Sequence, residues 1–518
     1  MDPFADRMSW QNRTIVLQLD GTGRLYQQVY RALRGEILSG RLASGERVPS
    51  TREIAHLLNI SRNTAVMAYE QLLAEGYIKA RLGAAGTVVA PVLPPDGYVS
   101  RPALTGQASL VSSRQAGPQV GPKLAAAGER FQRSARACSG SLGLSRLTWE
   151  LTPPHIRYDF RPGRASFADL PYALWCRLLG ARARSASLSD LEYGPPAGRL
   201  ELREAISARL RRLRGLNADP DRIVIVNGTQ QALDLISRVL LNPGDRVLME
   251  EPHYTGARCA FLAAGAELVF SPVDEHGIRI PRPAAGKRAC RLAYVTPSHQ
   301  FPTGAVLSIE RRLELLAWAS RLGAFIVEDD YDGEYRYDAQ PLQALGGLDR
   351  EGSTIYVGTF SKILFPSLRL GYLVLPKLLV EAFVATKAIG DTGTAALEQL
   401  TLADFIDAGH FDRHLRRTTA SNAARRKALV AALREQFGDR AEVCGANAGL
   451  HVFAWLKGKS GGPIKDASGK AERAGIGLYT ADPFYARPPD RTAILLGYAP
   501  LRERDIREGI RRLAAALR

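Results

Sequence analysis

The sequence predicts an α/β protein in two parts, a small helical domain with a hairpin and a larger domain built on a parallel sheet. Between residues 24 and 75, apolar positions recur at helical spacing and two segments begin with capping serines. Beyond residue 162, short apolar runs alternate with helical stretches. Between these parts the chain is rich in Pro, Gly, Ser and Ala. We therefore place the first domain at 12–91, a flexible linker at 92–150 and the second domain at 151–518.

Composition bounds the class of protein. The 518 residues are too many for one compact core, and a net charge of +17 favours a polyanionic partner. No stretch is long and apolar enough to span a bilayer, and the N-terminus lacks a signal-peptide pattern. The five cysteines show no CxxC spacing, which predicts reduced thiols rather than a disulfide framework or a zinc site. These features predict a cytoplasmic protein without membrane partners.

The first domain opens with three predicted helices. The first begins at Arg24 and ends where the chain reads SGRLASGERVPS. The second reads STREIAHLLNI, with Ser50 and Thr51 as candidate N-caps, and the third begins at the capping residue Ser61. The segment GYIKARLGAAGTVVAP then alternates apolar and polar residues around a Gly-rich turn, which predicts a hairpin. Together these elements predict a helix-turn-helix followed by a wing.

The exposed side of this motif carries side chains that donate hydrogen bonds to phosphates and base edges. The alternative is a small helical domain that binds a protein. The segment from Leu25 to Pro91 resembles the winged helix-turn-helix of GntR-type bacterial regulators, through the ordered run PSTREIA, SRNT and AYEQLLAEGY. The resemblance implies a double-stranded DNA operator as partner, with contacts from Arg52, Ser61, Arg62 and Thr64 and with Gly86 at the wing tip.

The linker at 92–150 cannot bury much apolar surface, so we expect an extended segment with one short helix near Lys123 to Ala137. The alternative is that its arginines form a second DNA-contacting arm.

The second domain contains six apolar runs separated by helical stretches, RIVIVNG, DRVLMEEP, CRLAYVTP, AFIVEDDY, STIYVGT and LGYLVLP. Strands that alternate with helices predict a parallel sheet covered on both faces. From about Gly445 onward such units are fewer, which predicts a smaller α+β lobe.

Several residues of this domain are the groups that pyridoxal phosphate requires, namely an amine, an acid, phosphate donors and a flat side chain. Lys362 follows a strand, at the sheet edge where open α/β sheets bind ligands. Asp329 and Tyr331 lie two residues apart and share a strand face. The acidic run around them lacks calcium-loop spacing, so no metal is predicted. A lone lysine is usually a surface residue, so the hypothesis depends on the combination.

The remaining requirements are met by a helix start and an aromatic residue. Gly228 and Thr229 open an amphipathic helix whose backbone N–H groups suit a phosphate dianion. Thr359, Ser361 and Arg369 complete a phosphate cup. Tyr254 follows a strand end and could lie over the ring, although an ordinary packed tyrosine is the alternative.

These residues occur in the order found in fold type I aminotransferases, which the chain resembles from LEYGPPAGRLELREAI to GYLVLP. The resemblance implies a Schiff base at Lys362, a pyridinium partner in Asp329, a ring 3-oxygen partner in Tyr331 and stacking by Tyr254. It also implies a homodimer, in which Tyr193 reaches the phosphate of the neighbouring subunit. The implied phosphate contacts come from Gly228, Thr229, Gln230, Thr359, Ser361 and Arg369.

Two departures from the aminotransferase pattern are visible. Phe301 stands where NPTG has its asparagine, so one contact to the ring oxygen is either missing or replaced. Leu495 stands where the arginine that clamps a substrate carboxylate belongs, and Arg491 lies two pleats away if the strand continues. A bidentate guanidinium orients amino acids for transamination, so we expect residual transaminase activity at most.

Together the two halves resemble the MocR subfamily of GntR regulators, in which an aminotransferase-like domain serves as a sensor. The missing clamp favours the branch that resembles PdxR, regulators of vitamin B6 synthesis for which pyridoxal phosphate is the signal. Branches that resemble GabR or TauR, which sense an amino compound through the bound cofactor, stay open. A working aminotransferase with an appended DNA-binding domain is the third possibility.

Overall fold

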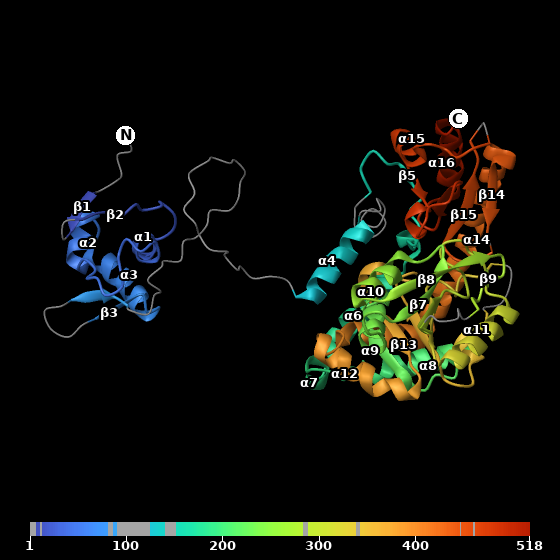
Figure 1. Cartoon of the computed structure of the whole chain (residues 1–518), viewed down its shortest axis with the longest axis horizontal. Helices are drawn as coiled ribbons and strands as arrows, with labels where there is room; N and C mark the ends of the chain where they lie inside the picture. Colours follow the sequence, from blue (N-terminus) through green and yellow to red (C-terminus); the bar gives the residue numbers. More distant parts are fainter. Residues whose placement is uncertain are drawn as a thin grey trace. The chain divides into compact units, whose positions relative to one another are not determined.

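The computed structural model describes residues 7–10, 13–80, 86–90, 125–139, 152–282, 288–337, 342–445, 447–458 and 461–518. The chain divides into two compact units, Met1–Val120 and Gly121–Arg518, each of which is described by itself (Figure 1). None of the helices in the described ranges combines the length and apolar composition needed to cross a bilayer.

The first unit is a three-helix domain with a wing. Its elements are β1 (Arg7–Trp10), β2 (Arg13–Val16), α1 (Leu25–Leu38), α2 (Thr51–Leu57), α3 (Arg62–Ala74), β3 (Ile78–Ala80) and β4 (Thr87–Val89). The three helices share a core that includes Val29, Leu33, Ile54, Ala65 and Leu72. Strands β3 and β4 pair antiparallel as the predicted wing. The predicted elements are thus confirmed, whereas the β1–β2 pair was not predicted.

Side-chain caps set the starts of α2 and α3. Ser50 accepts a hydrogen bond from the Glu53 amide at 3.2 Å, and Ser61 accepts one from the Thr64 amide at 3.1 Å. Asn59, between the helices, has a φ of 48°, a left-handed conformation that asparagine adopts more readily than most residues. The tight turn therefore follows from local sequence chemistry.

Helix α4 (Ala126–Ser139) lies inside the segment expected as a linker. It packs against α10 (Thr255–Ala264), where the Ser134 hydroxyl donates to the Cys259 carbonyl at 2.9 Å. Residues 92–124 and 140–150 lie outside the described residues. Cys259 is disulfide-bonded, so the expectation of reduced thiols throughout is wrong for this residue.

The second unit is built on an eight-stranded sheet in the order β6-β13-β12-β11-β10-β7-β8-β9. The strands are β6 (Ile223–Val226), β7 (Arg246–Glu251), β8 (Glu267–Asp274), β9 (Gly277–Ile278), β10 (Cys290–Val295), β11 (Phe325–Asp330), β12 (Thr354–Thr359) and β13 (Gly371–Val374). Strands β8, β7, β10, β11 and β12 run parallel, whereas β13 is antiparallel to both neighbours. The sheet is therefore mixed, because the connection from β12 to β13 is too short for a crossover helix.

Helices cover both faces of this sheet (Figure 1). They include α6 (Tyr172–Ser185), α8 (Leu200–Arg214), α9 (Thr229–Leu240), α10, α11 (Ile309–Leu322), α12 (Val380–Asp391) and α13 (Ala396–Asp407), whereas the short helix α7 (Leu188–Leu191) has no buried residue. Alternate residues of β6 show the two faces, since Ile223 and Ile225 join the core of α8 while Val224 and Val226 join that of α9.

The C-terminal lobe has its own core. Its elements are α14 (His410–Phe437), β14 (Ala441–Cys444), β15 (His451–Leu456), α15 (Ala467–Arg473), β16 (Ile476–Gly477), β17 (Tyr479–Thr480), β18 (Thr492–Gly497) and α16 (Glu503–Ala516). Four of its strands form an antiparallel sheet in the order β14-β15-β18-β17. Strand β5 (Tyr158–Asp159) pairs with β16 and brings the segment that follows it, including Gly163, to this lobe.

Candidate functional site

Lys362 lies just beyond the carboxyl end of β12, as predicted. Its ammonium group donates to the Gly163 carbonyl at 2.8 Å. Burial lowers the pKa of Lys362, whereas the Asp332 and Asp329 carboxylates act in the opposite direction. Gly163 has a φ of +75°, and a Cβ there would lie 2.9 Å from the amine, so glycine is required beside the lysine. A lysine held this way is available as a nucleophile.

A second buried lysine lies nearby but is committed to an ion pair. Lys387 on α12 is 2.7 Å from both carboxylate oxygens of Asp391. The contrast identifies Lys362 as the candidate nucleophile of this region.

Asp329 at the end of β11 is 3% exposed and interacts electrostatically with Lys362. Its Oδ2 accepts a hydrogen bond from the Tyr294 hydroxyl at 2.7 Å, whereas its buried Oδ1 has no partner among the described residues. Burial raises the pKa of Asp329 to about 7. An orphaned, buried carboxylate oxygen suits a ligand that presents a protonated ring nitrogen.

Tyr331 continues from β11 and meets a buried histidine and carboxylate. The Tyr331 hydroxyl is 2.9 Å from His299 Nδ1, and that nitrogen is 3.1 Å from both carboxylate oxygens of Asp332. His451 lies beside them and contacts the Pro302 carbonyl through Nε2 at 3.0 Å. One ligand atom each from His299, Asp332 and His451 lie within 4.8 Å of one another, but the absence of a metal stays a prediction.

Tyr254 and Phe301 form an aromatic wall. Tyr254 is the N-cap of α10, and its ring lies against Gly256, where a Cβ would approach to 2.5 Å. Phe301 meets the rings of Tyr254 and Tyr331 edge-on, each with centroids 5.8 Å apart. The residue in the asparagine position thus packs among aromatic rings and offers no hydrogen bond to a ligand.

Two of the residues predicted to bind phosphate, Gly228 and Arg369, lie together at the start of α9. Gly228 adopts a φ of 87°, and a Cβ there would lie 3.0 Å from the Arg369 guanidinium. Arg369, itself at a φ of 52°, donates to the Asn227 carbonyl at 2.5 Å. The structure therefore brings a cation onto the positive end of a helix dipole, close to the amide of Thr229. This pairing is unfavourable without an anion, which is why it suits a phosphate.

Of the other residues predicted to contact the phosphate, some lie next to Lys362 and others do not. The Ser361 amide donates to Thr359 Oγ1 at 3.2 Å, next to Lys362. The Gln230 side chain instead donates to the Gly256 carbonyl at 3.2 Å. Tyr193 is 88% exposed and lies outside this cluster within one chain.

The position expected to lack a carboxylate clamp is apolar. Leu495 on β18 is fully buried and packs in a cluster with Phe453, Phe484, Ala481 and Ala493, against which Phe301 also packs. Arg491 pairs with Glu442 and stacks on Trp455 at 4.6 Å, so its guanidinium is engaged elsewhere.

The helix-turn-helix presents the predicted DNA-contacting residues in different ways. Arg52 and Arg62 are exposed on α2 and α3. Ser61 caps α3, and its hydroxyl is 2.8 Å from that of Thr64, so both hydroxyls already have local partners. Gly86 has a φ of 66° just before β4, and residues 81–85 of the wing lie outside the described residues.

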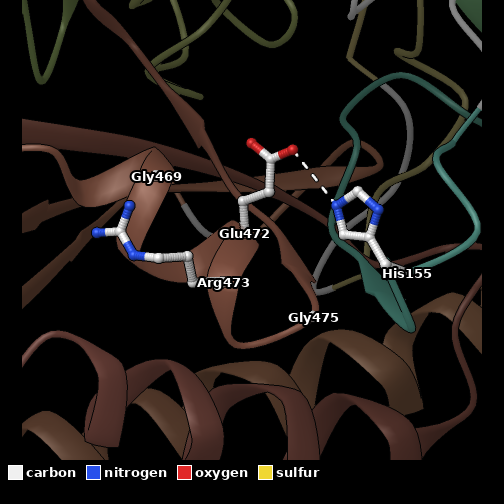
Figure 2. Close-up of a pocket in the computed structure, with 5 residues that line it drawn as sticks. All are labelled: His155, Gly469, Glu472, Arg473 and Gly475. Carbon is white, nitrogen blue, oxygen red and sulfur yellow. Dashed lines mark ion pairs between the residues drawn. The ribbon is translucent and has the colours of Figure 1, made fainter.

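A separate pocket of about 410 Å³ opens on the C-terminal lobe, lined by His155, Gly469, Glu472, Arg473 and Gly475 (Figure 2). His155 and Glu472 lie 3.4 Å apart across it. None of the predicted site residues lines this pocket.

Several residues that contact the predicted site residues or their neighbours were missed by sequence reasoning. They are Asn227, Glu250, Tyr294, His299, Asp332, Lys387 and Asp391. Asp391 accepts hydrogen bonds from the side-chain amide of Asn227 at 3.0 Å and from that of Gln231 at 2.6 Å, and so supports the start of α9. The i,i+4 spacing of Lys387 and Asp391 was the available signal.

The raised pKa of Asp329 predicts a stability penalty. Its pKa rises from 3.8 to about 7 on folding, so between these values the folded chain holds a proton that the unfolded chain has released. The stability of the cofactor-free protein therefore falls as pH rises through this window. We expect Asp329→Asn to raise the free energy of unfolding at pH 8 by about 2–4 kcal/mol, and by less at pH 5.

Chemical unfolding followed by circular dichroism at both pH values measures this effect. Asp330→Asn is the control, because Asp330 forms a buried ion pair with Arg214 and its loss should destabilise the fold. Equal or lower stability of Asp329→Asn at pH 8 would contradict the prediction.

Two protein families match the chain. The model described as bacterial regulatory proteins, gntR family, matches residues 25–89, and the model for aminotransferase class I and II matches residues 177–473. In solved structures, the α-aminoadipate aminotransferase LysN of Thermus thermophilus, complexed with N-(5′-phosphopyridoxyl)-L-leucine, is 27% identical with a TM-score of 0.66. That match covers 75% of this chain and 97% of LysN.

Curated relatives share both halves. The probable rhizopine catabolism regulatory protein MocR of Rhizobium meliloti is 37% identical over 97% of this chain and 95% of its own length. The HTH-type transcriptional regulator TauR of Rhodobacter capsulatus is 32% identical over 96% and 97%. The pyridoxine biosynthesis transcriptional regulator PdxR of Corynebacterium glutamicum is 29% identical over 82% of each chain. The chain therefore belongs to the MocR-type regulators, in which a GntR helix-turn-helix domain precedes a class I and II aminotransferase domain.

Proposed function

We propose that this protein is a transcriptional regulator that binds double-stranded DNA through its winged helix-turn-helix and pyridoxal phosphate through the pocket around Lys362. One observation carries the proposal. The pocket keeps an amine, an acid, an aromatic wall and a phosphate cup, while a buried leucine occupies the clamp position at Leu495. A pocket suited to a cofactor but not to an amino-acid carboxylate fits a sensor better than an enzyme.

The described residues suggest how the cofactor would be held. Lys362 supplies the amine for its aldehyde, and the orphaned Oδ1 of Asp329 faces its ring nitrogen. Tyr331 meets its 3-oxygen, Tyr254 covers its ring, and Arg369 with the start of α9 holds its phosphate. When bound, pyridoxal phosphate supplies an electron-accepting ring and a carbonyl that reacts with amines.

The regulated process that these features favour is vitamin B6 metabolism, with pyridoxal phosphate as the effector. Leu495 and the surrounding aromatic side chains give a second ligand no charged anchor at that wall. The similarity to PdxR, whose name states pyridoxine biosynthesis, supports the same effector.

Exposed side chains in the segment 188–193 also support a homodimer. Tyr193 is 88% exposed, and Leu188 and Leu191, which precede it, are 84% and 67% exposed. Exposed apolar side chains grouped in one short segment are typical of an interface. A second copy of the chain would cover them and would bring Tyr193 to the neighbouring phosphate cup.

A second candidate effector is an amine that also carries an acidic group, such as taurine or GABA. Arg164 follows Gly163, the acceptor for Lys362, is partly buried, and makes no hydrogen bond or ion pair with the described parts of the chain. Burial and the nearby Arg161 guanidinium lower the pKa of Arg164. An unpaired guanidinium beside a reactive lysine suits a carboxylate or sulfonate, and TauR is among the relatives.

DNA recognition is tested at Arg62. We expect Arg62→Ala to weaken binding to a selected operator by about 1–3 kcal/mol if the guanidinium contacts a base, with relaxed preference at one position. Fluorescence anisotropy with operator variants measures this. Arg41→Ala is the control for the charge change, because Arg41 lies outside the helix-turn-helix and pairs with Glu36. Equal losses in both variants would contradict a specific role for Arg62.

The cofactor's role is tested by titrating operator binding with pyridoxal phosphate. We expect operator affinity to change about 5- to 150-fold, the usual range of coupling between two sites. Lys362→Ala should abolish both this change and the borohydride-stable adduct, whereas Lys377→Ala, at an exposed lysine, should keep both. A normal response in Lys362→Ala would show that the site is wrong.

The effector is distinguished from a substrate by an amine panel. Because Leu495 offers none of the charge-assisted bonds worth about 1.5–3 kcal/mol each, α-amino acids should change the visible cofactor band slowly or not at all. Rapid conversion by an α-amino acid would instead identify an aminotransferase. A change with taurine or GABA that alters operator affinity, and is lost in Arg164→Ala, would identify the amine as the effector.

A further inference from the structure

We propose that His299 is a positioning residue that holds Tyr331 as a hydrogen-bond donor toward the cofactor and so replaces the side chain lost at Phe301. The inference rests on the proposed binding of pyridoxal phosphate at Lys362.

Three contacts carry this inference. His299 Nδ1 is 2.9 Å from the Tyr331 hydroxyl and 3.1 Å from each carboxylate oxygen of Asp332. His299 and Asp332 are 2% and 1% exposed, so water does not compete for these bonds. The three groups therefore form a hydrogen-bonded series that runs from a buried carboxylate, through the imidazole, to the phenol.

The positions of the protons determine which of these three groups donates each hydrogen bond and which accepts it. Because a carboxylate only accepts hydrogen bonds, the proton on Nδ1 points toward Asp332. A protonated Nδ1 cannot accept a hydrogen bond from Tyr331. Its single N–H is therefore shared between the Asp332 carboxylate and the phenol oxygen, and the phenol's own proton stays free for another acceptor. Burial raises the pKa of Tyr331 well above its usual value, so the phenol keeps that proton. Tyr331 thus presents a donor to the pocket.

The backbone around His299 is shaped for its ring. A Cβ on Gly449 would lie 2.1 Å from His299 Cε1, and a Cβ on Gly304 would lie 3.0 Å from its Nε2. His299 Nε2 is buried without a hydrogen-bond partner in the described ranges. Two glycines from distant parts of the chain thus admit the imidazole, although one of its nitrogens is left unsatisfied. A buried imidazole with an unsatisfied nitrogen destabilises the fold, which favours a functional role for His299 over a purely packing role.

Phe301 explains why such a residue is needed. It occupies the position from which an asparagine would reach the ring oxygen, and its ring stands edge-on to Tyr331 at 5.8 Å. A phenyl edge offers Tyr331 no hydrogen bond, so the phenol's orientation depends on His299.

Other charged groups surround the pair and set the background for a pH measurement. Asp332, Asp329, Glu250 and Asp330 act on Tyr331, and His299, Asp332 and Lys362 act on His451 beside it. Apart from His299 itself, a substitution at His299 leaves all of these groups in the sequence, so their charges are common to the variants compared.

The test uses the full-length protein loaded with pyridoxal phosphate and follows its visible absorbance against pH. A donor to the ring 3-oxygen withdraws charge from it and disfavours a proton on the neighbouring linkage nitrogen. Tyr331→Phe should therefore raise the pH midpoint of the band by about one unit, the size expected for one hydrogen bond. His299→Asn should raise the midpoint in the same direction, and Tyr331→Phe/His299→Asn should match Tyr331→Phe alone.

Three outcomes would overturn the inference. The first is an unchanged midpoint in His299→Asn, and the second is a shift that adds fully to that of Tyr331→Phe. The third is loss of the band in His299→Asn with thermal unfolding unchanged, because a residue acting through Tyr331 cannot matter more than Tyr331 itself. If His299→Asn fails to fold, His299→Gln decides in its place, with an upward shift expected and no shift contradicting the inference. Absence of any band in the unsubstituted protein would instead refute cofactor binding itself.

Discussion

The buried ion pair between Arg214 and Asp330 is the constraint on which the pocket depends. Both side chains are at most 4% exposed, and Asp330 also accepts from the Tyr356 hydroxyl. Strand β11 ends in three consecutive acidic residues, which would repel one another in a dry interior. The ion pair with Arg214 on α8 compensates the charge of Asp330, so that this charge repels its acidic neighbours less. Asp329, on the opposite strand face, is then left to face Lys362.

The neighbouring acid is satisfied by backbone rather than by a cation. Glu328 accepts from the amides of Leu345 and Gly346 at 2.8 and 2.9 Å. The acids of β11 thus divide between the two faces of the strand, and each has its own means of compensation. The Oδ1 atoms of Asp329 and Asp330 both lack a hydrogen-bond partner among the described residues, but Asp330 is held by its ion pair with Arg214, which leaves Asp329 as the acid available to a ligand.

Sequence reasoning predicted what local chemistry determines. Ser50 and Ser61 were identifiable as caps, and Asp329 with Tyr331 as one strand face, because caps and strand alternation need only neighbouring residues. The contact of His299 with Asp332 joins residues 33 positions apart, so no local spacing could reveal it. Lys387 and Asp391 had helical spacing, but their burial depends on how α12 packs. Tyr193 is exposed in the single chain, so its contact with the phosphate of a neighbouring subunit stays a prediction.

Helix α10 has a mechanical consequence. It is ten residues long, which makes it a rod of about 15 Å, with Tyr254 as its N-cap and α4 packed along its side. A rigid rod converts a small tilt at one end into a displacement of whatever rests on it. The Tyr254 side chain and helix α4 are therefore both attached to one helix, α10. If a ligand that binds at Tyr254 reorients α10, then by thermodynamic reciprocity a displacement of α4 changes the affinity of the protein for that ligand.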